Sequence, residues 1–530
     1  MVSVLAADAE CLIGIARILQ DIIAGTLPHS LKPFLLSSTI IGLDKHNGTG
    51  IRPIAIGESF YRLACYKALR QDINSIIQIL LPIQLGVSVS GGCEAIIINL
   101  NLVLEEGARM ISRQTGSAVA ALVIDFSNAF NTISREAVMK ALYSHRSLSH
   151  LWSLVNYAYA DPTDLYAQDD DHSVTPRLVS SEGVRQGDPL SALLFALGIH
   201  PVYKQTLSAH PNICGAAILD DFTMVGTPDE LILAYQTLRD RSAIIHLKIQ
   251  PDKSKLIYYH EDIDPLSSSV KNFLHLEGIQ LVDTATSVLG APVGLEEDRM
   301  KLVKQMVDIQ IGGMKILLHD HLPAQEAIML LRMSSNHKMD YLLRCVPPSI
   351  IQTQAARYDA AVIDTFTSKL DLSSQLANPS MDSQAIICQI QKPISDGGFG
   401  LTSAESLSHR AFISSVAATT QSSMSLTLFS PPRARHSPAS TISSSSTLHA
   451  QVTNSLNHIQ QQISSQDYNA LLPQTTDAFF HEFGKKRRSS SSQIMYTSYG
   501  LQRDLSEALH KRQRTMLMDD ITAIDNTEHE

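Results

Sequence analysis

The chain has 530 residues, 44% of them hydrophobic and 18% charged, so its length suggests about three domains with substantial cores. Its formal net charge of −10 at pH 7 argues weakly against a nucleic-acid partner, because phosphate contacts come mainly from Lys and Arg. The sequence has no C-x-x-C pair and no apolar run of the roughly 18 residues that a membrane span needs, which disfavours a zinc knuckle, a disulfide framework and a membrane partner.

The first 118 residues are expected to form N-terminal helices and a strand pair. Apolar residues recur at helical spacing from Val2 to Leu36. Residues 39–43 and 51–56 have the pattern of strands on either side of a turn-rich loop, and residues 59–81 follow as an amphipathic helix. Basic residues outnumber acidic ones around the strand pair, whereas the middle of the chain is acidic.

Three aspartates follow or interrupt predicted strands in the middle of the chain. Residues 119–124 are apolar and β-branched, and this strand delivers Asp125 at its end. Two short strands then enclose Asp220 and Asp221. Side chains alternate across a strand, so adjacent aspartates cannot share one face within it. A hairpin with both at its tip resolves this, and it lets Asp220 face Asp125 while Asp221 lies at the periphery.

Carboxylates that converge from separate strands suit divalent metal ions. Mg²⁺ prefers carboxylate oxygens and fills its remaining positions with phosphate or water. Two such ions can promote nucleotide addition by lowering the pKa of an attacking hydroxyl and neutralising the leaving pyrophosphate. An isolated Asp-Asp pair is more often a solvated turn, and we expect this of the acidic run at residues 169–171.

The C-terminal part of the chain is expected to be mainly helical. Helical patterns extend over residues 299–416, a Ser/Thr/Pro-rich linker occupies 417–450, and 451–530 is predicted to be helical, basic and partly disordered. The run Lys485–Arg488 is either an import signal or RNA-binding patch, or simply solvated surface. We expect an intracellular protein, in the nucleus or nucleocytoplasm.

Three blocks, in this order along the chain, resemble the palm motifs of reverse transcriptases. They are Leu122–Asn131, Glu182–Ser191 and Ile218–Phe222. Asp-Phe-Ser-Asn-Ala-Phe-Asn in the first block is similar to non-LTR (LINE-type) retrotransposons, and Gly-x-x-Gln-Gly-x-Pro-Leu-Ser in the second is the most specific motif. The resemblance covers roughly residues 27–401. It implies an α+β right-hand polymerase with N-terminal helices and fingers in 1–118, an antiparallel palm sheet with the remaining fingers elements in 119–298, and a helical thumb and connection in 299–416.

The resemblance also implies roles for the acidic residues. Asp125 and Asp220 would bridge two Mg²⁺ ions, with Mn²⁺ as a possible substitute. Asp221 would complete the acidic set, and the Phe126 carbonyl would contact the metal on the nucleotide side. Lys253 would stabilise or protonate the departing pyrophosphate, with Lys255 as the rival for that role.

The same resemblance implies a set of substrate contacts. Phe130 stands where the family places an aromatic ring under the incoming sugar, whose bulk would clash with a 2′-hydroxyl. From periodicity alone, Phe130 is more simply a core aromatic. Lys45 and Arg52 resemble cationic contacts to the triphosphate, and the less favoured alternative for Lys45 is a solvated surface charge. The glycines beside Gln186 would let the backbone approach the nascent base pair. The substrate-binding set is Lys45, Arg52, Phe130, Gly183, Gln186 and Gly187.

These observations predict an RNA-directed DNA polymerase of a retrotransposon that adds dNTPs to a primer 3′-hydroxyl. Its partners would be an RNA template and a DNA primer or target DNA. One alternative is a catalytically silent remnant or domesticated nucleic-acid-binding protein, which the net acidity and Ile218 in a usually aromatic position favour. A less favoured alternative is an RNA-dependent RNA polymerase, which would need a small polar residue in place of Phe130. The sequence leaves the copied RNA and the oligomeric state open.

Overall fold

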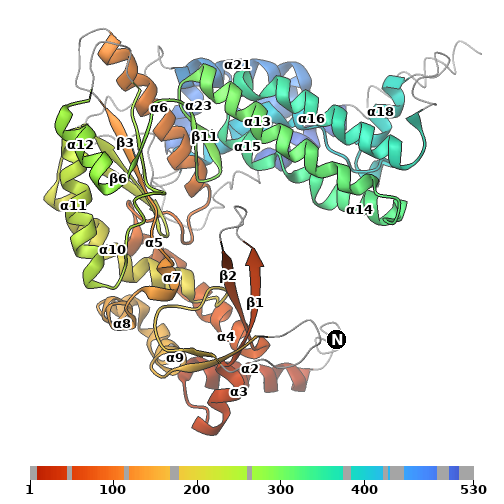
Figure 1. Cartoon of the computed structure of the whole chain (residues 1–530). Coiled ribbons are helices and arrows are strands. Elements are labelled where there is room, and N and C mark those ends of the chain that lie inside the picture. Colours follow the sequence, from red (N-terminus) through yellow and green to blue (C-terminus); the bar gives the residue numbers. More distant parts are fainter. Residues whose placement is uncertain are drawn as a thin grey trace, which may run out of the picture. The chain divides into compact units, whose positions relative to one another are not determined.

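The computed structural model describes residues 9–44, 50–112, 119–167, 178–259, 266–373, 383–421, 428–429, 447–485 and 501–512. The chain divides into two compact units. The first consists of residues 1–89, 120–256 and 266–281, and the second of residues 90–119, 257–265 and 282–530. Figure 1 labels the elements of both.

A four-stranded sheet and the helices at one end of its strands form one part of the first unit (Figure 1). Its strands are β1 (Ser38–Asp44), β2 (Ile51–Gly57), β4 (Thr163–Ala167) and β5 (Leu178–Ser180). The order is β2-β1-β4-β5, in which β1–β2 and β4–β5 are antiparallel and β1–β4 is parallel. The helices of this part are α2 (Ala9–Ala24), α3 (Lys32–Leu36), α4 (Ser59–Leu69), α5 (Ile73–Leu80) and α9 (Ser149–Tyr159). The predicted strand pair is therefore confirmed.

The helix expected over residues 59–81 is divided in two. Helix α4 ends at Leu69, and one turn of 3-10 helix follows over Arg70–Asp72. The Asp72 carboxylate then caps α5 by accepting a hydrogen bond from the Ser75 N–H at 3.2 Å. Because an Asp side chain competes with the helix for backbone donors, the amphipathic period alone overestimated the length of this helix.

A five-stranded sheet forms the other part of the first unit, in the order β6-β7-β3-β8-β9. Its strands are β3 (Ala120–Ile124), β6 (Cys214–Ile218), β7 (Asp221–Gly226), β8 (Lys255–Ile257) and β9 (Gln280–Val282). Strand β7 pairs antiparallel with both β3 and β6. The associated helices are α7 (Ala129–Thr132), α8 (Arg135–Tyr143), α10 (Ser191–Ala209), α11 (Pro228–Ile244) and α12 (Ser268–Glu277). The continuous apolar sequence of β3 fits its position, because four of its five residues are buried.

The dipeptide Asp188-Pro189 has the sequence pattern of a helix cap and a first helical residue, but the apolar helix that follows it starts later. Helix α10 begins at Ser191 with Leu190 in the capping position, so Asp188 and Pro189 are not the cap and first residue. The Asp188 side chain instead forms a buried ion pair with Arg185 while accepting a hydrogen bond from the Leu190 N–H at 2.9 Å.

The second unit is mainly helical, as predicted for the region after residue 299. Its helices are α6 (Gly92–Ser112), α13 (Glu296–Met314), α14 (Ala324–Met333), α15 (Asp340–Cys345), α16 (Pro348–Lys369), α18 (Ser383–Gln391), α19 (Ala404–Gln421), α21 (Thr447–Gln462), α22 (Ser465–Leu471) and α23 (Thr476–Lys485). Residues 501–512 are also helical. Strands β10 (Thr286–Val288) and β11 (Ala291–Val293) form a small antiparallel hairpin.

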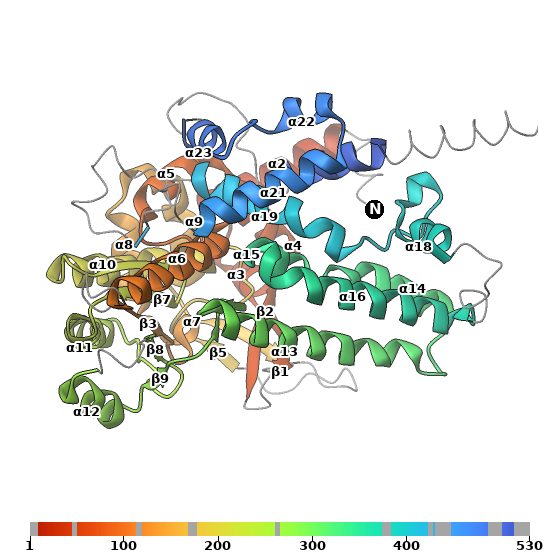
Figure 2. The same cartoon turned by 90° about the horizontal axis from the view of Figure 1, so that it is seen from above.

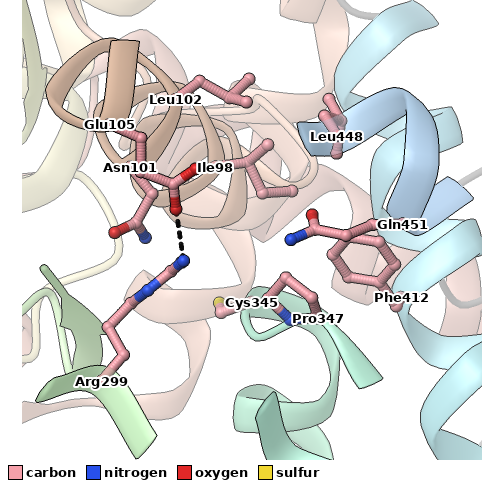
Figure 3. Close-up of a pocket in the computed structure, with 10 residues that line it drawn as sticks. All are labelled: Ile98, Asn101, Leu102, Glu105, Arg299, Cys345, Pro347, Phe412, Leu448 and Gln451. Carbon is pink, nitrogen blue, oxygen red and sulfur yellow. Dashed lines mark hydrogen bonds and ion pairs between the residues drawn. The ribbon is translucent and has the colours of Figure 1, made fainter. Parts of the chain in front are cut away.

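Helix α6 belongs to the second unit, which differs from the predicted first domain of residues 1–118. Buried Asn101 on α6 accepts a hydrogen bond from the Gly294 N–H at 3.1 Å and donates to the Pro292 carbonyl at 3.3 Å, so it is tied to β11. Glu105 on the same helix forms a buried ion pair with Arg299 of α13. Figure 3 shows this pair beside a cavity of about 20 Å³, which is room for about one water molecule.

Helix α19 packs against α6, α15, α16, α21 and α23, and Figure 2 shows it beside α21. Together with residues 501–509, these C-terminal helices enclose a cluster of buried apolar side chains that includes Phe412, Ile459 and Phe479. The described part of the C-terminal region therefore contributes to a packed core as far as Phe483 and again over residues 501–509. Residues 486–500 and 513–530, and with them most of the basic run Lys485–Arg488, lie outside the described residues.

The edges of the predicted linker at 417–450 are helical, because α19 continues to Gln421 and α21 begins at Thr447. The Ser/Thr content of α19 made the sequence resemble a linker. In the structure Ser414 donates to the Arg410 carbonyl at 2.7 Å and Thr419 to the Ser415 carbonyl at 2.9 Å, so the helix itself satisfies these buried hydroxyls. Most of the linker lies outside the described residues.

Within the described ranges, no single helix is both long enough and apolar enough to cross a membrane. One bent pair, Glu10–Ala24 with His29–Leu36 at 98°, meets the same criteria of length and composition only when the two helices are taken together.

Candidate active site

The five-stranded sheet brings the three predicted aspartates to one end of neighbouring strands. Strands β6 and β7 form a hairpin whose last pair is Ile218 with Asp221, so Leu219 and Asp220 make a two-residue turn. The predicted hairpin is confirmed, but the turn itself carries only Asp220, and Asp221 is the first residue of β7. Because Ile124 of β3 pairs with Phe222, Asp125 and Asp221 both lie one residue beyond this pair, at the same end of the two strands.

The three carboxylates influence one another electrostatically. Desolvation, and after it the charge of Asp125, raises the pKa of Asp220 above its ordinary value. Desolvation and the charges of Asp220 and Asp125 raise the pKa of Asp221 to about 7. Arg52 on strand β2 acts in the opposite direction on both carboxyls. Clustered acids whose pKa values stay raised despite Arg52 indicate a site where negative charge is only partly compensated, which is typical of functional carboxylates.

The chemistry of this donor set fits a hard divalent cation, because carboxylate oxygens are the ligands that Mg²⁺ prefers. Among the residues that the structure describes, no three His, Cys, Asp or Glu side chains are grouped closely enough to form a metal cage by themselves. For an ion held by these aspartates, substrate phosphates or water would complete the coordination.

Asp125 is fixed by the segment that precedes β8. Its N–H donates to the Ser254 hydroxyl at 3.2 Å, and its carbonyl accepts from the Gln250 N–H at 2.8 Å. Ser254 is fully buried. The Ser127 N–H donates to the Lys248 carbonyl at 2.9 Å. These ladder bonds use the Asp125 carbonyl and the Ser127 N–H.

Phe126 forms an antiparallel bridge with Ile249 in this ladder. The hydrogen bonds on either side of this bridge are made by the Asp125 carbonyl and the Ser127 N–H, so the Phe126 carbonyl points away from Ile249. This orientation is compatible with its predicted role as a metal contact. Lys253 is exposed on the turn after Gln250, and Lys255 is half-buried on β8. Desolvation lowers the pKa of Lys255. The structure does not choose between the two lysines as pyrophosphate contact, so the assignment to Lys253 stays a prediction.

Phe130 lies half-buried with one ring face on the core. Its ring stacks on that of Phe195, with centroids 4.5 Å apart and planes 10° from parallel. The Phe130 carbonyl accepts a hydrogen bond from the Val184 N–H at 2.7 Å. Gly183 has a φ of +65°, and a Cβ at this position would collide with the backbone of Phe130 and Asn131. The structure thus brings the predicted sugar contact and the start of the Gln186 loop together.

The other end of this loop is joined to the four-stranded sheet. The Gln186 carbonyl accepts a hydrogen bond from the Ala55 N–H of β2 at 2.6 Å. Gly187 has a φ of +101°, and a Cβ there would lie 2.7 Å from the Ala55 carbonyl oxygen. Because Arg52 lies on the same strand, one strand positions both the loop and the predicted phosphate contact. Lys45 lies outside the described residues.

A buried ion pair beneath the loop was not predicted from the sequence. Arg185 contacts Asp188 at 2.8 Å, and both side chains are 3% exposed. Arg185 also donates to the Leu36 carbonyl and the Thr163 hydroxyl at 3.0 Å, and Tyr61 donates to Asp188 at 2.8 Å. The signal available in the sequence was an Arg and an Asp three residues apart within an otherwise glycine-rich and apolar motif.

Residues 43–293 match the family of reverse transcriptases (RNA-dependent DNA polymerases), and this range includes all three aspartates, Phe130 and the Gln186 loop. The chain contains a reverse transcriptase domain. Over 217 residues the chain is 28% identical to the retrotransposable element SLACS 132 kDa protein of Trypanosoma brucei gambiense. That alignment covers 41% of this chain and 17% of the relative, so the chain spans about a sixth of that protein. The predicted relationship to non-LTR retrotransposon reverse transcriptases is confirmed.

Solved structures of telomerase show a more distant likeness to this chain. Apo telomerase of Candida tropicalis covers 68% of this chain and 68% of its own length, at 10% identity and a TM-score of 0.38. A form of it truncated from the C-terminal domain covers 49% of this chain and 54% of its own, at 12% identity and a TM-score of 0.35. A likeness of this degree assigns no function. The family match, together with the two main sheets and the surrounding helices, confirms the α+β right-hand polymerase class predicted from the sequence.

Proposed function

We propose that this chain is an RNA-directed DNA polymerase that adds deoxynucleotides to a primer 3′-hydroxyl on an RNA template. The observation that carries the proposal is the convergence of Asp125, Asp220 and Asp221 within a reverse transcriptase domain. An isolated Asp-Asp turn on a protein surface would lack the third carboxylate that a neighbouring strand supplies here.

In this proposal Asp125 and Asp220 hold two Mg²⁺ ions, or Mn²⁺, assisted by Asp221 and the Phe126 carbonyl. When bound, these ions activate the 3′-hydroxyl and stabilise the leaving pyrophosphate. Arg52 contributes a positive charge that acts on Asp220 and Asp221, which supports its proposed role as a contact to a triphosphate at the same site. A guanidinium can grip phosphate oxygens through two parallel hydrogen bonds.

The choice of deoxynucleotides is assigned to Phe130. Its stacking on Phe195 restricts the ring, so it would resist displacement by a 2′-hydroxyl. The Gln186 loop, held between the Phe130 backbone and strand β2, would present backbone to the nascent base pair. Lys253 is the proposed partner of the departing pyrophosphate.

The proposed partners are an RNA template, a DNA primer or target DNA, and dNTPs, within a non-LTR retrotransposon. The relationship to a retrotransposable element protein supports this setting. Activity in the nucleus is part of the same proposal, because a chromosomal DNA target would be found there. Fractionation of cells that express the full chain would test that location.

Primer extension on an RNA template with Mg²⁺ tests the proposal, with Asp220→Ala as the inactive variant and Asp240→Ala as the matched control. Asp240 is an exposed aspartate, with 72% of its side chain accessible. We expect Asp220→Ala to lower extension at least about 100-fold and Asp240→Ala to leave it unchanged. If the parent makes no more product than Asp220→Ala but still binds an RNA–DNA hybrid, the chain is a binding protein.

A further inference from the structure

The turn that carries Asp220 has an unusual backbone. Leu219, its first residue, has a φ of +56°, in the left-handed region that residues other than Gly, Asn and Asp rarely adopt. The preceding residue ends β6 and the residue after Asp220 begins β7. The direction in which Asp220 and Asp221 leave the hairpin therefore depends on a conformation that leucine alone does not favour.

The side-chain amide of Gln84 holds this residue from both sides. Its Oε1 accepts a hydrogen bond from the Leu219 N–H at 2.7 Å, and its Nε2 donates to the Leu219 carbonyl at 3.0 Å. Gln84 is fully buried. A second bond to the same carbonyl comes from the Tyr203 hydroxyl at 3.1 Å. Both peptide groups flanking the Leu219 Cα are thus fixed by buried side chains.

Gln84 is itself positioned by the strand that leads into the turn. The Leu85 N–H donates to the Ala217 carbonyl at 2.8 Å, and the Ala217 N–H donates to the Ile83 carbonyl at 2.7 Å. Residue 84 therefore forms a parallel bridge with Ala217 of β6. The amide also accepts from the Gly86 N–H at 3.0 Å. A Cβ on Gly86 would lie 2.8 Å from the Leu219 nitrogen, so this position requires glycine for close approach.

We propose that Gln84 is a positioning residue of the active site, whose buried amide holds Leu219 in the left-handed conformation that presents Asp220 and Asp221. This inference rests on the proposed function for its link to activity. Gln84 touches neither the carboxylates nor any substrate, and it acts through the backbone of the turn.

Three variants probe this role. Gln84→Met keeps the length of the side chain but removes all its hydrogen bonds. Gln84→Glu can accept from the Leu219 N–H, but its carboxylate cannot donate to the Leu219 carbonyl. Gly86→Ala keeps the Gln84 side chain but adds a Cβ that would meet the Leu219 nitrogen at 2.8 Å and the Gln84 Oε1 at 3.0 Å. Asn101→Leu is the matched control, because Asn101 is also a buried amide that holds a backbone N–H and a backbone carbonyl, those of Gly294 and Pro292.

Three measurements are made on the full chain: Mn²⁺ affinity by electron paramagnetic resonance, hydrogen exchange of residues 214–222, and the Mg²⁺ concentration that gives half-maximal extension. For the Gln84 and Gly86 variants we expect Mn²⁺ affinity to fall about 10- to 100-fold, the typical effect of losing a group that orients metal ligands. Exchange of the turn should accelerate, and the Mg²⁺ requirement should rise. Asn101→Leu should lower stability without changing any of the three.

A double variant gives a direct test of the conformational role. Glycine adopts a positive φ without steric cost, so Leu219→Gly should restore part of the Mn²⁺ affinity lost in Gln84→Met. The proposal is overturned if Gln84→Met and Gly86→Ala lose stability but keep the Mn²⁺ affinity and turn exchange of the parent. If the parent extends no primer while Mn²⁺ binding and exchange still respond to Gln84, the polymerase proposal fails and the positioning role stands.

Discussion

Asp221 combines an accessible side chain with a pKa raised to about 7. Water reaches part of the residue, but neighbouring protein atoms surround the carboxyl, and Asp220 and Asp125 add negative charge. A carboxyl of this kind is half protonated near neutral pH. Metal binding requires the deprotonated form, so proton release and metal uptake are coupled at this residue.

Metal affinity should therefore depend on pH. Because the pKa of Asp221 is raised to about 7, the protonated form competes with the metal below that pH, and affinity should rise with pH and level off above it. Between pH 6 and pH 8 we expect about a tenfold increase in Mn²⁺ affinity, measured by titration at constant ionic strength. Asp221→Asn should bind more weakly with a flatter profile. A profile of equal slope in parent and variant would contradict this assignment.

Sugar selection should depend on the Phe130 ring. Phe130→Ala removes the surface that would meet a 2′-hydroxyl, so the preference for dNTPs over rNTPs should fall at least about tenfold in kcat/KM. Phe195→Leu retains Phe130 but removes the ring on which it stacks, and a smaller loss of preference is expected. Single-nucleotide incorporation with dNTP and matching rNTP measures both. An unchanged ratio in an active Phe130→Ala enzyme would return Phe130 to the status of a core aromatic.

Elements whose burial comes from one continuous apolar stretch could be predicted from the sequence. Strand β3 and the β6–β7 hairpin were located to within about two residues, because buried strands and a polar Asp-Asp turn have local signatures. The same local signatures placed Asp125 and Asp220, and the electrostatic coupling of their carboxyls agrees with that placement.

Features that depend on distant partners were not predictable from periodicity. Gln84 is separated from Leu219 by 135 residues, and no local pattern links them. Asp188 resembles a helix cap in the sequence, yet its main partner is Arg185, which also reaches the Leu36 carbonyl 149 residues away. In both cases a buried polar side chain meets its partner only through the tertiary fold.

Breaking the Arg185–Asp188 pair should strongly destabilise the first unit. Asp188→Asn leaves a buried guanidinium without its counter-charge, which costs about 3–5 kcal/mol in comparable pairs. The double variant Arg185→Met/Asp188→Leu should lose less free energy of unfolding than the sum of the losses in Arg185→Met and Asp188→Leu. Glu277→Gln is the control, since its pair with Arg239 is partly exposed and should be worth about 1 kcal/mol or less. Urea denaturation gives these values, and additive single changes would refute the coupling.

Over the whole molecule, the C-terminal helices contribute to folding more than composition suggests. Leu448, Val452, Leu456 and Ile459 recur at helical spacing along α21 and are buried with Phe479. This stripe is visible in the sequence, but the neighbouring Ser/Thr-rich stretch obscured it. Helices α21 and α23 complete the core beside α19.

Removing a large side chain from this core should destabilise the second unit. Phe479 is fully buried, and Phe479→Ala is expected to cost about 3–5 kcal/mol. Ile309→Ala, at a position that is 72% exposed, should change stability by no more than about 0.5 kcal/mol. Thermal and chemical unfolding of the full chain compare the two. Equal effects would show that the C-terminal helices are not part of the stable core.

The Phe130 carbonyl and the Val184 N–H share one hydrogen bond, and Gly183 leaves no space between the two segments. Phe130, which is assigned to the sugar, and the Gln186 loop, which is assigned to the base pair, are therefore expected to move together. Copying accuracy and sugar preference should consequently change together in variants of either segment.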